Sequence, residues 1–161
     1  MKKTVFILVI VLFCIGLVSI ISTKGSSNQI VKEGVDSEKL VATIYKEPTC
    51  GCCGVYSSYM KAEGYSVDIK NMEDLSPIKE ELGIPNELLS CHTTEIANYV
   101  LEGHVPNEAI EKLLIEKPDI KGIGMAGMPS GSPGMPGPKT EDFMIYEINN
   151  DGTAGKIFLT I

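Results

Sequence analysis

The sequence predicts one α/β domain behind an apolar N-terminal segment. An apolar run leads into a helical pattern at residues 40–63, the same order repeats at 65–83, and two further apolar runs close the chain. With 161 residues, of which 43% are hydrophobic, the chain can build one sizeable core and still hold a targeting or anchoring segment.

The first strand and the first helix flank a turn rich in cysteine. Leu40–Tyr45 is an apolar run that predicts a strand. Cys53–Glu63 predicts a helix, with Gly64 ending it at the C′ position. Its apolar side chains fall on one face and are Val55, Tyr56, Tyr59 and Met60.

A second strand and a second helix repeat this order. Tyr65–Ile69 alternates with period two, as a strand does. Ser76 is a helix cap, Pro77 suits the first helical position, and Gly83 ends a short helix. Strands in this order form a parallel pair with a right-handed crossover.

Two strands are expected near the C-terminus, at Phe143–Ile148 and Lys156–Ile161, with the hairpin signal Asn150–Gly152 between them. A β-α-β-α unit followed by a β-hairpin is the element order of a thioredoxin-like core. We expect the terminal helix of that fold to be missing, since Ile161 is the last residue.

The segment from Pro85 to Lys139 resembles an insertion between these halves. It contains a predicted strand at Ile96–Leu101 and a predicted helix at Pro106–Lys117. Gly122–Gly137 then holds six glycines, three prolines and three methionines. We expect no regular element in this loop, and a loop of this length in a compact domain is usually functional or disordered.

Residues 1–21 are predicted to be a membrane anchor or uncleaved signal. Lys2 and Lys3 precede the apolar run Val5–Ile21, which is just long enough to span a membrane and lacks a clear cleavage site. The lysines place the N-terminus inside, so the rest lies outside the cytoplasm. Residues 22–37 are a polar linker, and 38–161 form the domain. The alternative is cleavage of the signal and a secreted or periplasmic domain.

Charge argues against nucleic acid as a partner. The chain has a formal charge of −7, and without residues 1–21 it keeps 12 basic and 21 acidic residues, a charge of −9. None of the basic residues is an arginine, the residue best suited to bidentate phosphate contacts.

The turn before the first helix carries Cys50, Cys52 and Cys53. Free backbone N–H groups and the helix dipole at such a position favour the thiolate, which binds soft metals and attacks disulfides. Cys50 and Cys53 form a C-x-x-C pair, and Cys50 and Cys52 a C-x-C chelate. The spacing alone leaves metal binding and redox chemistry open.

A second set of soft ligands lies in the inserted segment. It comprises Cys91, His92, His104 and the loop methionines Met125, Met128 and Met135. Thiolate, thioether and imidazole together suit Cu(I) first and zinc second. Extended backbone would point Cys91 and His92 to opposite sides, so we expect Cys91 and His104 at the site, with Met128 as the leading methionine. Met128–Pro129 is also a candidate for the cis-proline that thioredoxin-like folds carry opposite the cysteine turn.

Four motifs resemble, in order, those of the CopG family of small exported metal-binding proteins associated with bacterial copper resistance. They are Cys50–Gly54, Ser90–Thr93, Glu102–Pro106 and Gly127–Met135, and the resemblance covers about residues 40–161. It implies a thioredoxin-like fold, copper held by cysteine sulfurs, and a role in copper detoxification outside the cytoplasm, with a change of copper oxidation state as a further option. Tyr56 departs from the tryptophan expected in many relatives.

We therefore expect an exported, tethered protein that binds copper, as Cu(I), through Cys50, Cys52, Cys53 and Cys91, with His104 and Met128 as supplementary ligands. Four thiolates exceed the need of one Cu(I), which favours a small multinuclear cluster. Partners would be the metal ion, the membrane through the N-terminal helix, and copper-handling or electron-donor proteins. The alternative is an extracytoplasmic thiol–disulfide oxidoreductase using Cys50 and Cys53, which leaves Cys52 and Cys91 unexplained.

Overall fold

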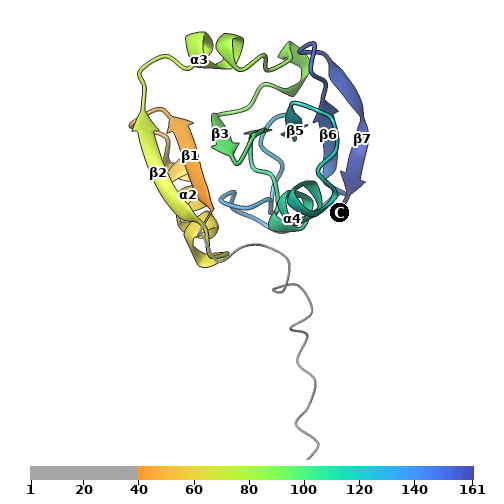
Figure 1. Ribbon diagram of the computed structural model, residues 1–161. Helices are drawn as coiled ribbons and strands as arrows, with labels where there is room; N and C mark the ends of the chain where they lie inside the picture. Colours follow the sequence, from red (N-terminus) through yellow and green to blue (C-terminus); the bar gives the residue numbers. More distant parts are fainter. Residues whose placement is uncertain (1–39) are drawn as a thin grey trace, which may run out of the picture. The chain divides into compact units, whose positions relative to one another are not determined.

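The computed structural model describes residues 40–161 (Figure 1). The predicted anchor at 1–21 and linker at 22–37 lie outside the described residues, as do residues 38 and 39 of the predicted domain. Among residues 40–161, no helix combines the length and the apolar character needed to span a membrane.

All strands of the described chain belong to one sheet of seven strands, in the order β2-β1-β3-β4-β5-β6-β7. The strands are β1 (Val41–Lys46), β2 (Ser66–Asn71), β3 (His92–Ile96), β4 (Tyr99–Glu102), β5 (Gly122–Gly124), β6 (Met144–Ile148) and β7 (Ala154–Thr160). The helices are α2 (Gly51–Ala62), α3 (Ser76–Glu81) and α4 (Asn107–Glu116), with a 3₁₀ turn, η1, at Asn86–Leu88.

The predicted thioredoxin-like α/β fold is confirmed. β1 and β2 are parallel, β1 and β3 are antiparallel, and β3 and β4 form the hairpin that follows the β-α-β-α unit. The prediction placed that hairpin at the C-terminus and expected the terminal helix to be missing. The hairpin is instead β3–β4, and α4 follows it as the terminal helix. The β6–β7 hairpin exists as well, but it extends the sheet beyond this unit.

Three local predictions in the middle of the chain were wrong. The single strand predicted at 96–101 is in fact interrupted by the turn of the β3–β4 hairpin: Ala97 has a φ of 52° and ends β3 after Ile96, and β4 begins at Tyr99. Gly122–Gly124, which we expected to lie in an irregular loop, forms β5 and pairs with β4 and β6. All peptide bonds in residues 40–161 are trans, so the cis-proline predicted at Met128–Pro129 is absent.

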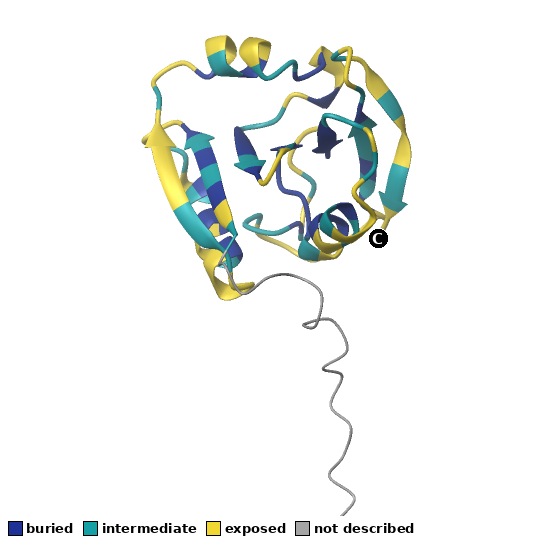
Figure 2. Ribbon diagram, viewed as in Figure 1, coloured by how far each residue is buried: buried dark blue, intermediate teal, exposed yellow. Residues whose placement is uncertain are grey.

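Apolar side chains from α2, α4 and the central strands form the main core. Its largest buried members include Tyr56, Ile44, Met60, Leu101, Ile110, Leu113 and Ile123. Val100 and Ile148 pack on a second, smaller cluster with Ile84 and Leu88. Figure 2 shows the edge strands β2 and β7 as the more exposed part of the sheet, while the inner strands are mostly buried.

Candidate metal centre

The cysteine turn begins at the end of β1 and continues into the first turn of α2. Cys50 is the N-cap of α2: its backbone is extended, and its sulfur accepts a hydrogen bond from the Cys53 backbone N–H at 3.3 Å. The helix therefore begins two residues before the predicted start at Cys53, and the whole C-x-C-C motif lies on its first turn. Cys50 and Cys53 form a disulfide. Among the described cysteines, Cys52 and Cys91 are free thiols.

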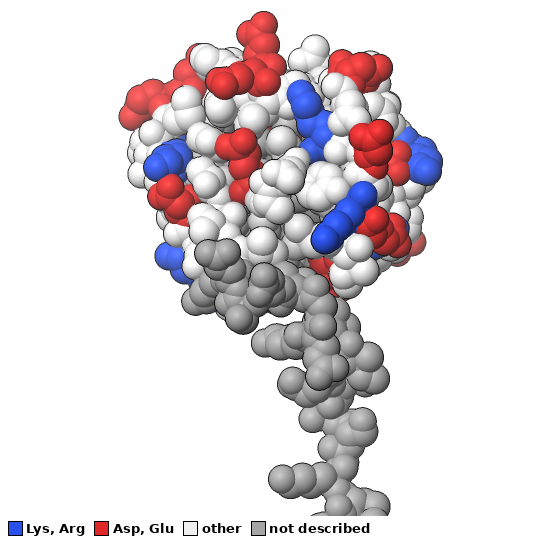
Figure 3. All heavy atoms as spheres, in the orientation of Figure 1, with Lys and Arg blue, Asp and Glu red and all other residues white. Residues whose placement is uncertain are grey.

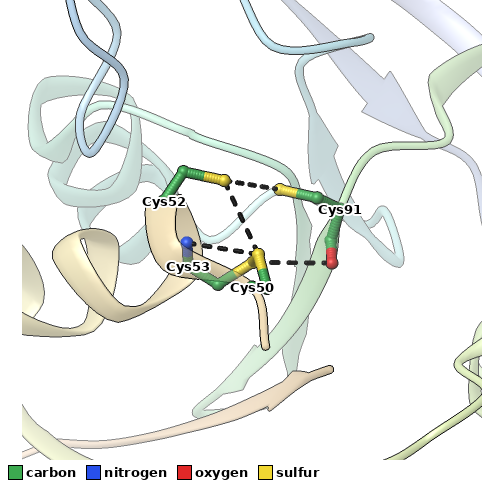
Figure 4. A group of neighbouring side chains, drawn as sticks. All are labelled: Cys50, Cys52, Cys53 and Cys91. Atoms are coloured by element: carbon green, nitrogen blue, oxygen red, sulfur yellow. Dashed lines mark hydrogen bonds between the residues drawn. A yellow bond between two sulfur atoms is a disulfide. The ribbon is translucent and has the colours of Figure 1, made fainter. Parts of the chain in front are cut away.

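Cys91 completes the cysteine cluster, the name used below for Cys50, Cys52, Cys53 and Cys91. Figure 4 shows its side chain directed at the turn from the other side. The Cys52 sulfur lies 3.5 Å from that of Cys50 and 3.8 Å from that of Cys91. All four sulfur atoms lie within 4.8 Å of one another, although Cys91 is 38 residues beyond Cys53 in the chain.

Strand pairing and a buried ion pair hold Cys91 in this position. His92 opens β3 and pairs with Lys46, the last residue of β1, so the start of β3 lies beside the cysteine turn. Just before it, the Ser90 backbone N–H donates to the carboxylate of Glu102 on β4 at 2.7 Å. That fully buried carboxylate also accepts from the ammonium of Lys79 on α3, at 2.5 Å.

His104 reaches the cluster from the loop between β4 and α4. Its Nε2 lies 3.0 Å from the Cys91 sulfur, and its Nδ1 lies 2.7 Å from the Pro133 carbonyl oxygen. A carbonyl only accepts, so Nδ1 carries the proton and Nε2 presents its lone pair to Cys91. Burial lowers the pKa of His104, which keeps the ring neutral at pH 7, the form that ligates metals.

His92 is a further member of the site that the sequence analysis set aside. Its ring is fully buried, and its Nδ1 lies 3.3 Å from the Cys91 sulfur. Its Nε2 has no hydrogen-bond partner in the described structure. Burial lowers the pKa of His92 well below its ordinary value. Cys91, His92 and His104 thus form a second group with metal-ligating geometry that shares Cys91 with the first.

The expectation that only one of Cys91 and His92 faces the cysteine turn agrees with the two metal-ligating groups, because Cys91 joins Cys50, Cys52 and Cys53 whereas His92 joins only Cys91 and His104. The His92 ring nevertheless contacts the Cys91 sulfur, and the reason is local. The alternation of side chains holds within a strand, whereas Cys91 lies in a bend and β3 begins at His92. The adjacent Cys-His pair, a soft thiol beside an imidazole, was the sequence signal that pointed to His92.

The Cys91 thiol is held in its protonated form. Burial, together with the neighbouring Cys52 thiol, raises the pKa of Cys91 to about 12. Without a cation the proton therefore stays on the sulfur at neutral pH. A soft metal ion that binds this sulfur must displace the proton, which couples metal binding to proton release.

The three loop methionines have different surroundings. Met125 is buried in the main core and Met135 is partly buried, whereas Met128 is 52% exposed. No hydrogen bond joins the Met128 sulfur to the cysteine cluster in the described chain, so its predicted role as a ligand stays a prediction. The loop itself does reach the site, because the Pro133 carbonyl holds His104 and Gly134 packs on the backbone of Cys52 and Tyr56.

Two solved structures resemble the described domain closely. Both are titled "Copper resistance protein copG", forms 2 and 1, and both are 34% identical in sequence to this chain. Form 2 gives a TM-score of 0.71 and form 1 one of 0.70, and each match covers 77% of this chain. The matches cover 99% and 98% of those two chains.

This chain belongs to the CopG family of copper resistance proteins. A family model described as "Protein of unknown function, DUF411" matches residues 88–135, the stretch that carries Cys91, both histidines and the loop. No curated protein matches the chain. The resemblance inferred from the four sequence motifs is confirmed.

The donor set of the CopG-type site favours soft metal ions. It combines four sulfur atoms with two neutral imidazoles, and none of its members is a carboxylate. Hard cations such as Mg²⁺ and Ca²⁺ prefer oxygen ligands, whereas thiolate and imidazole suit copper and zinc. While the Cys50–Cys53 disulfide is closed, only two of the four sulfurs can become thiolates, so a four-thiolate site requires its reduction.

Proposed function

We propose that the domain binds Cu(I) in a small thiolate cluster and acts in copper resistance outside the cytoplasm. Cys50, Cys52, Cys53 and Cys91 are the sulfur ligands, and His104 and Met128 are the supplementary ones. The observation that carries the proposal is the convergence of four cysteine sulfurs within 4.8 Å in a member of the CopG family. Zinc is the second choice of metal, because histidine and thiolate also suit it.

The number of sulfurs supports more than one copper ion per chain. Cu(I) is satisfied by two or three soft ligands, and each thiolate can bridge two ions. The 3.5 and 3.8 Å separations place Cys52 between Cys50 and Cys91, the central position that a bridging sulfur would take.

Location outside the cytoplasm follows from residues 1–21, proposed here as an uncleaved signal anchor. Lys2 and Lys3 keep the N-terminus in the cytoplasm, and residues 22–37 then link the domain to the extracytoplasmic surface of the same membrane. The disulfide supports this placement, because such bonds persist in oxidising compartments and are rare in the cytosol. Release after signal cleavage is the alternative.

A second candidate function is thiol–disulfide exchange by Cys50 and Cys53. The observation that favours it is the disulfide itself, which joins a C-x-x-C pair at the N-terminus of α2. An enzyme of this kind has no need of Cys91, whereas a metal site uses it as a ligand.

Cys91→Ser separates the two functions. The reduced full-length protein and its Cys91→Ser and Cys52→Ser variants are loaded with Cu(I) anaerobically, and copper per chain is measured after gel filtration. We expect Cys91→Ser to lose at least as much copper as Cys52→Ser, with unchanged circular dichroism. Normal copper content in Cys91→Ser, with disulfide reductase activity that depends only on Cys50 and Cys53, would favour the oxidoreductase.

A further inference from the structure

A cleft of about 670 Å³ opens beside the cysteine cluster and reaches two of its members, Cys50 and Cys91. It lies between the cysteine turn, α3 and the segment that leads into β3. Its lining includes Glu47, Cys50, Asp74, Lys79, Glu80 and Cys91. Its volume is within the range that holds small organic ligands.

The two halves of the disulfide differ in their access to this cleft. Cys50 is partly exposed and belongs to the cleft wall, whereas Cys53 is fully buried and does not line it. The cleft wall therefore includes Cys50 and not Cys53, so a molecule in the cleft meets the disulfide from its Cys50 side.

The cleft is acidic. Glu47, Asp74 and Glu80 line it, and its one lysine, Lys79, is neutralised by the buried carboxylate of Glu102. Asp74 is fully charged at neutral pH, because the backbone N–H of Ser76 donates to its carboxylate and lowers its pKa. Figure 3 shows acidic side chains gathered around the position of α3. Three carboxylates around a confined opening attract cations and repel anions.

We propose that this cleft admits the external reductant of the Cys50–Cys53 disulfide, and that the reductant is a thiol carrying positive charge near its sulfur. Because reduction completes the four-thiolate site, the inference rests on the proposed function for its purpose. The preference for a cationic thiol is a property of the cleft, and it would hold even if the protein bound no copper.

The exchange takes place in two steps. The external thiolate attacks the Cys50 sulfur, a mixed disulfide forms, the Cys50–Cys53 bond breaks, and Cys53 leaves as a thiolate that takes up a proton. A second external thiol attacks the mixed disulfide, which releases Cys50 as a thiol and the two external thiols as a disulfide. Two electrons pass from the external thiols to the protein.

Small thiols of different charge test the preference. Cysteamine is cationic, 2-mercaptoethanol neutral and mercaptoethanesulfonate anionic. Each reduces the metal-free full-length protein at pH 7 and low ionic strength, and alkylation with peptide mass mapping follows opening of the Cys50–Cys53 bond. The rate for each thiol is divided by the rate at which the same thiol reduces a neutral small disulfide, which removes differences in intrinsic thiol reactivity. We expect the normalised order cysteamine, then mercaptoethanol, then mercaptoethanesulfonate.

The variant Glu47→Gln, Asp74→Asn, Glu80→Gln removes the three charges, and the side-chain oxygen of Asn at position 74 can still accept the hydrogen bond from the Ser76 backbone N–H. We expect the normalised rate ratio of cysteamine to mercaptoethanesulfonate to fall about tenfold. The control variant Glu108→Gln, Glu116→Gln, Glu141→Gln changes net charge equally at exposed positions outside the cleft, and its ratio should stay within about twofold of the wild type.

An unchanged ratio in the cleft variant, or an equal fall in the control, would overturn the inference. In the wild-type protein, 0.5 M salt should reduce the same ratio by screening, and a salt-independent ratio would also contradict it. Copper content after full reduction by a phosphine is measured for every variant. Loss of copper binding with charge discrimination intact would reject the proposed function and leave the thiol preference standing.

Discussion

Replacing Glu102 by glutamine should destabilise the fold and loosen the segment that positions Cys91. The Glu102 side chain is fully buried, and that of its partner Lys79 is 10% exposed. The carboxylate accepts from Lys79 at 2.5 Å, from the Thr93 hydroxyl at 2.6 Å and from the Ser90 backbone at 2.7 Å. The hydrogen bond that joins the Ser90 backbone to β4 therefore depends on this carboxylate.

The expected loss is about 3 kcal/mol of unfolding free energy. Removing one partner of a buried ion pair costs roughly 3–5 kcal/mol, because the other charge stays buried without compensation. Glutamine keeps the shape and one acceptor oxygen for Lys79 and Ser90, so the loss should lie near the lower end. Lys79→Met leaves the carboxylate unpaired, and its cost should depend on pH.

The sign of this pH dependence follows from the carboxyl group. Burial raises the pKa of Glu102 above its ordinary value even though Lys79 and the hydrogen bonds oppose the shift. Without Lys79 the pKa rises further. The folded state then favours the protonated acid, whose stabilising effect is complete below about pH 4.3 and is lost as pH rises through the folded pKa. Lys79→Met should therefore cost more at pH 7 than at pH 5.

Urea unfolding of the metal-free protein with its disulfide closed measures these free energies. The double variant should lose less than the sum of the single variants, with a coupling of at least about 1 kcal/mol. Lys70→Met is the control, since Lys70 and Asp68 form an exposed pair worth about 1 kcal/mol or less. If Glu102→Gln costs no more than this control, the ion pair does not hold the Ser90 segment.

Three further outcomes are expected. Gly134→Ala should lower the thermal unfolding midpoint more than Gly127→Ala. Both glycines have positive φ, but of the two only Gly134 would place a Cβ against backbone, 2.8 Å from the Cys52 carbonyl oxygen. Equal effects of the two substitutions would reject close packing of the loop on the cysteine turn. The unfolding free energy of the metal-free protein should fall below about pH 6.5, by about 1.4 kcal/mol per pH unit for each buried histidine, because His92 and His104 have lowered pKa values. In urea titrations, His92→Asn should make this fall with pH less steep. An unchanged dependence of the unfolding free energy on pH would contradict the role of His92. The native protein should sediment with membranes, whereas a soluble form beginning after Ile21 would show cleavage.

Much of the fold could be predicted because local patterns and long-range pairing agree. Apolar runs, Gly64 after α2 and Pro77 at the start of α3 fix β1, α2, β2 and α3 within a few residues. The β3–β4 hairpin was missed because its turn residues, Ala97 and Asn98, include neither glycine nor proline. The end of β3 and most of β4 were therefore predicted as one strand that runs across the turn.

Part of the site depended on structure that no local pattern specifies. The C-x-C-C motif identified the part of the site formed by Cys50, Cys52 and Cys53. Cys91 was identified because it is the other cysteine of the predicted domain and has histidine and methionine residues near it in the sequence. That His92 contacts the Cys91 sulfur depends on where β3 begins, which pairing with β1 decides. The contact between Pro133 and His104 joins residues 29 positions apart and becomes apparent only when the loop is folded over the site.

The central claim is that the reduced cysteine cluster selects Cu(I). The direct measurement is a competition in which fully reduced full-length protein receives equimolar Cu(I) and Zn(II) together with a chromogenic Cu(I) chelator, and metal per chain is determined after gel filtration. We expect copper to be retained against the chelator, zinc to be absent, and copper retention to fall sharply when the Cys50–Cys53 disulfide is closed beforehand. Zinc retained in place of copper, or all copper lost to the chelator, would contradict the account.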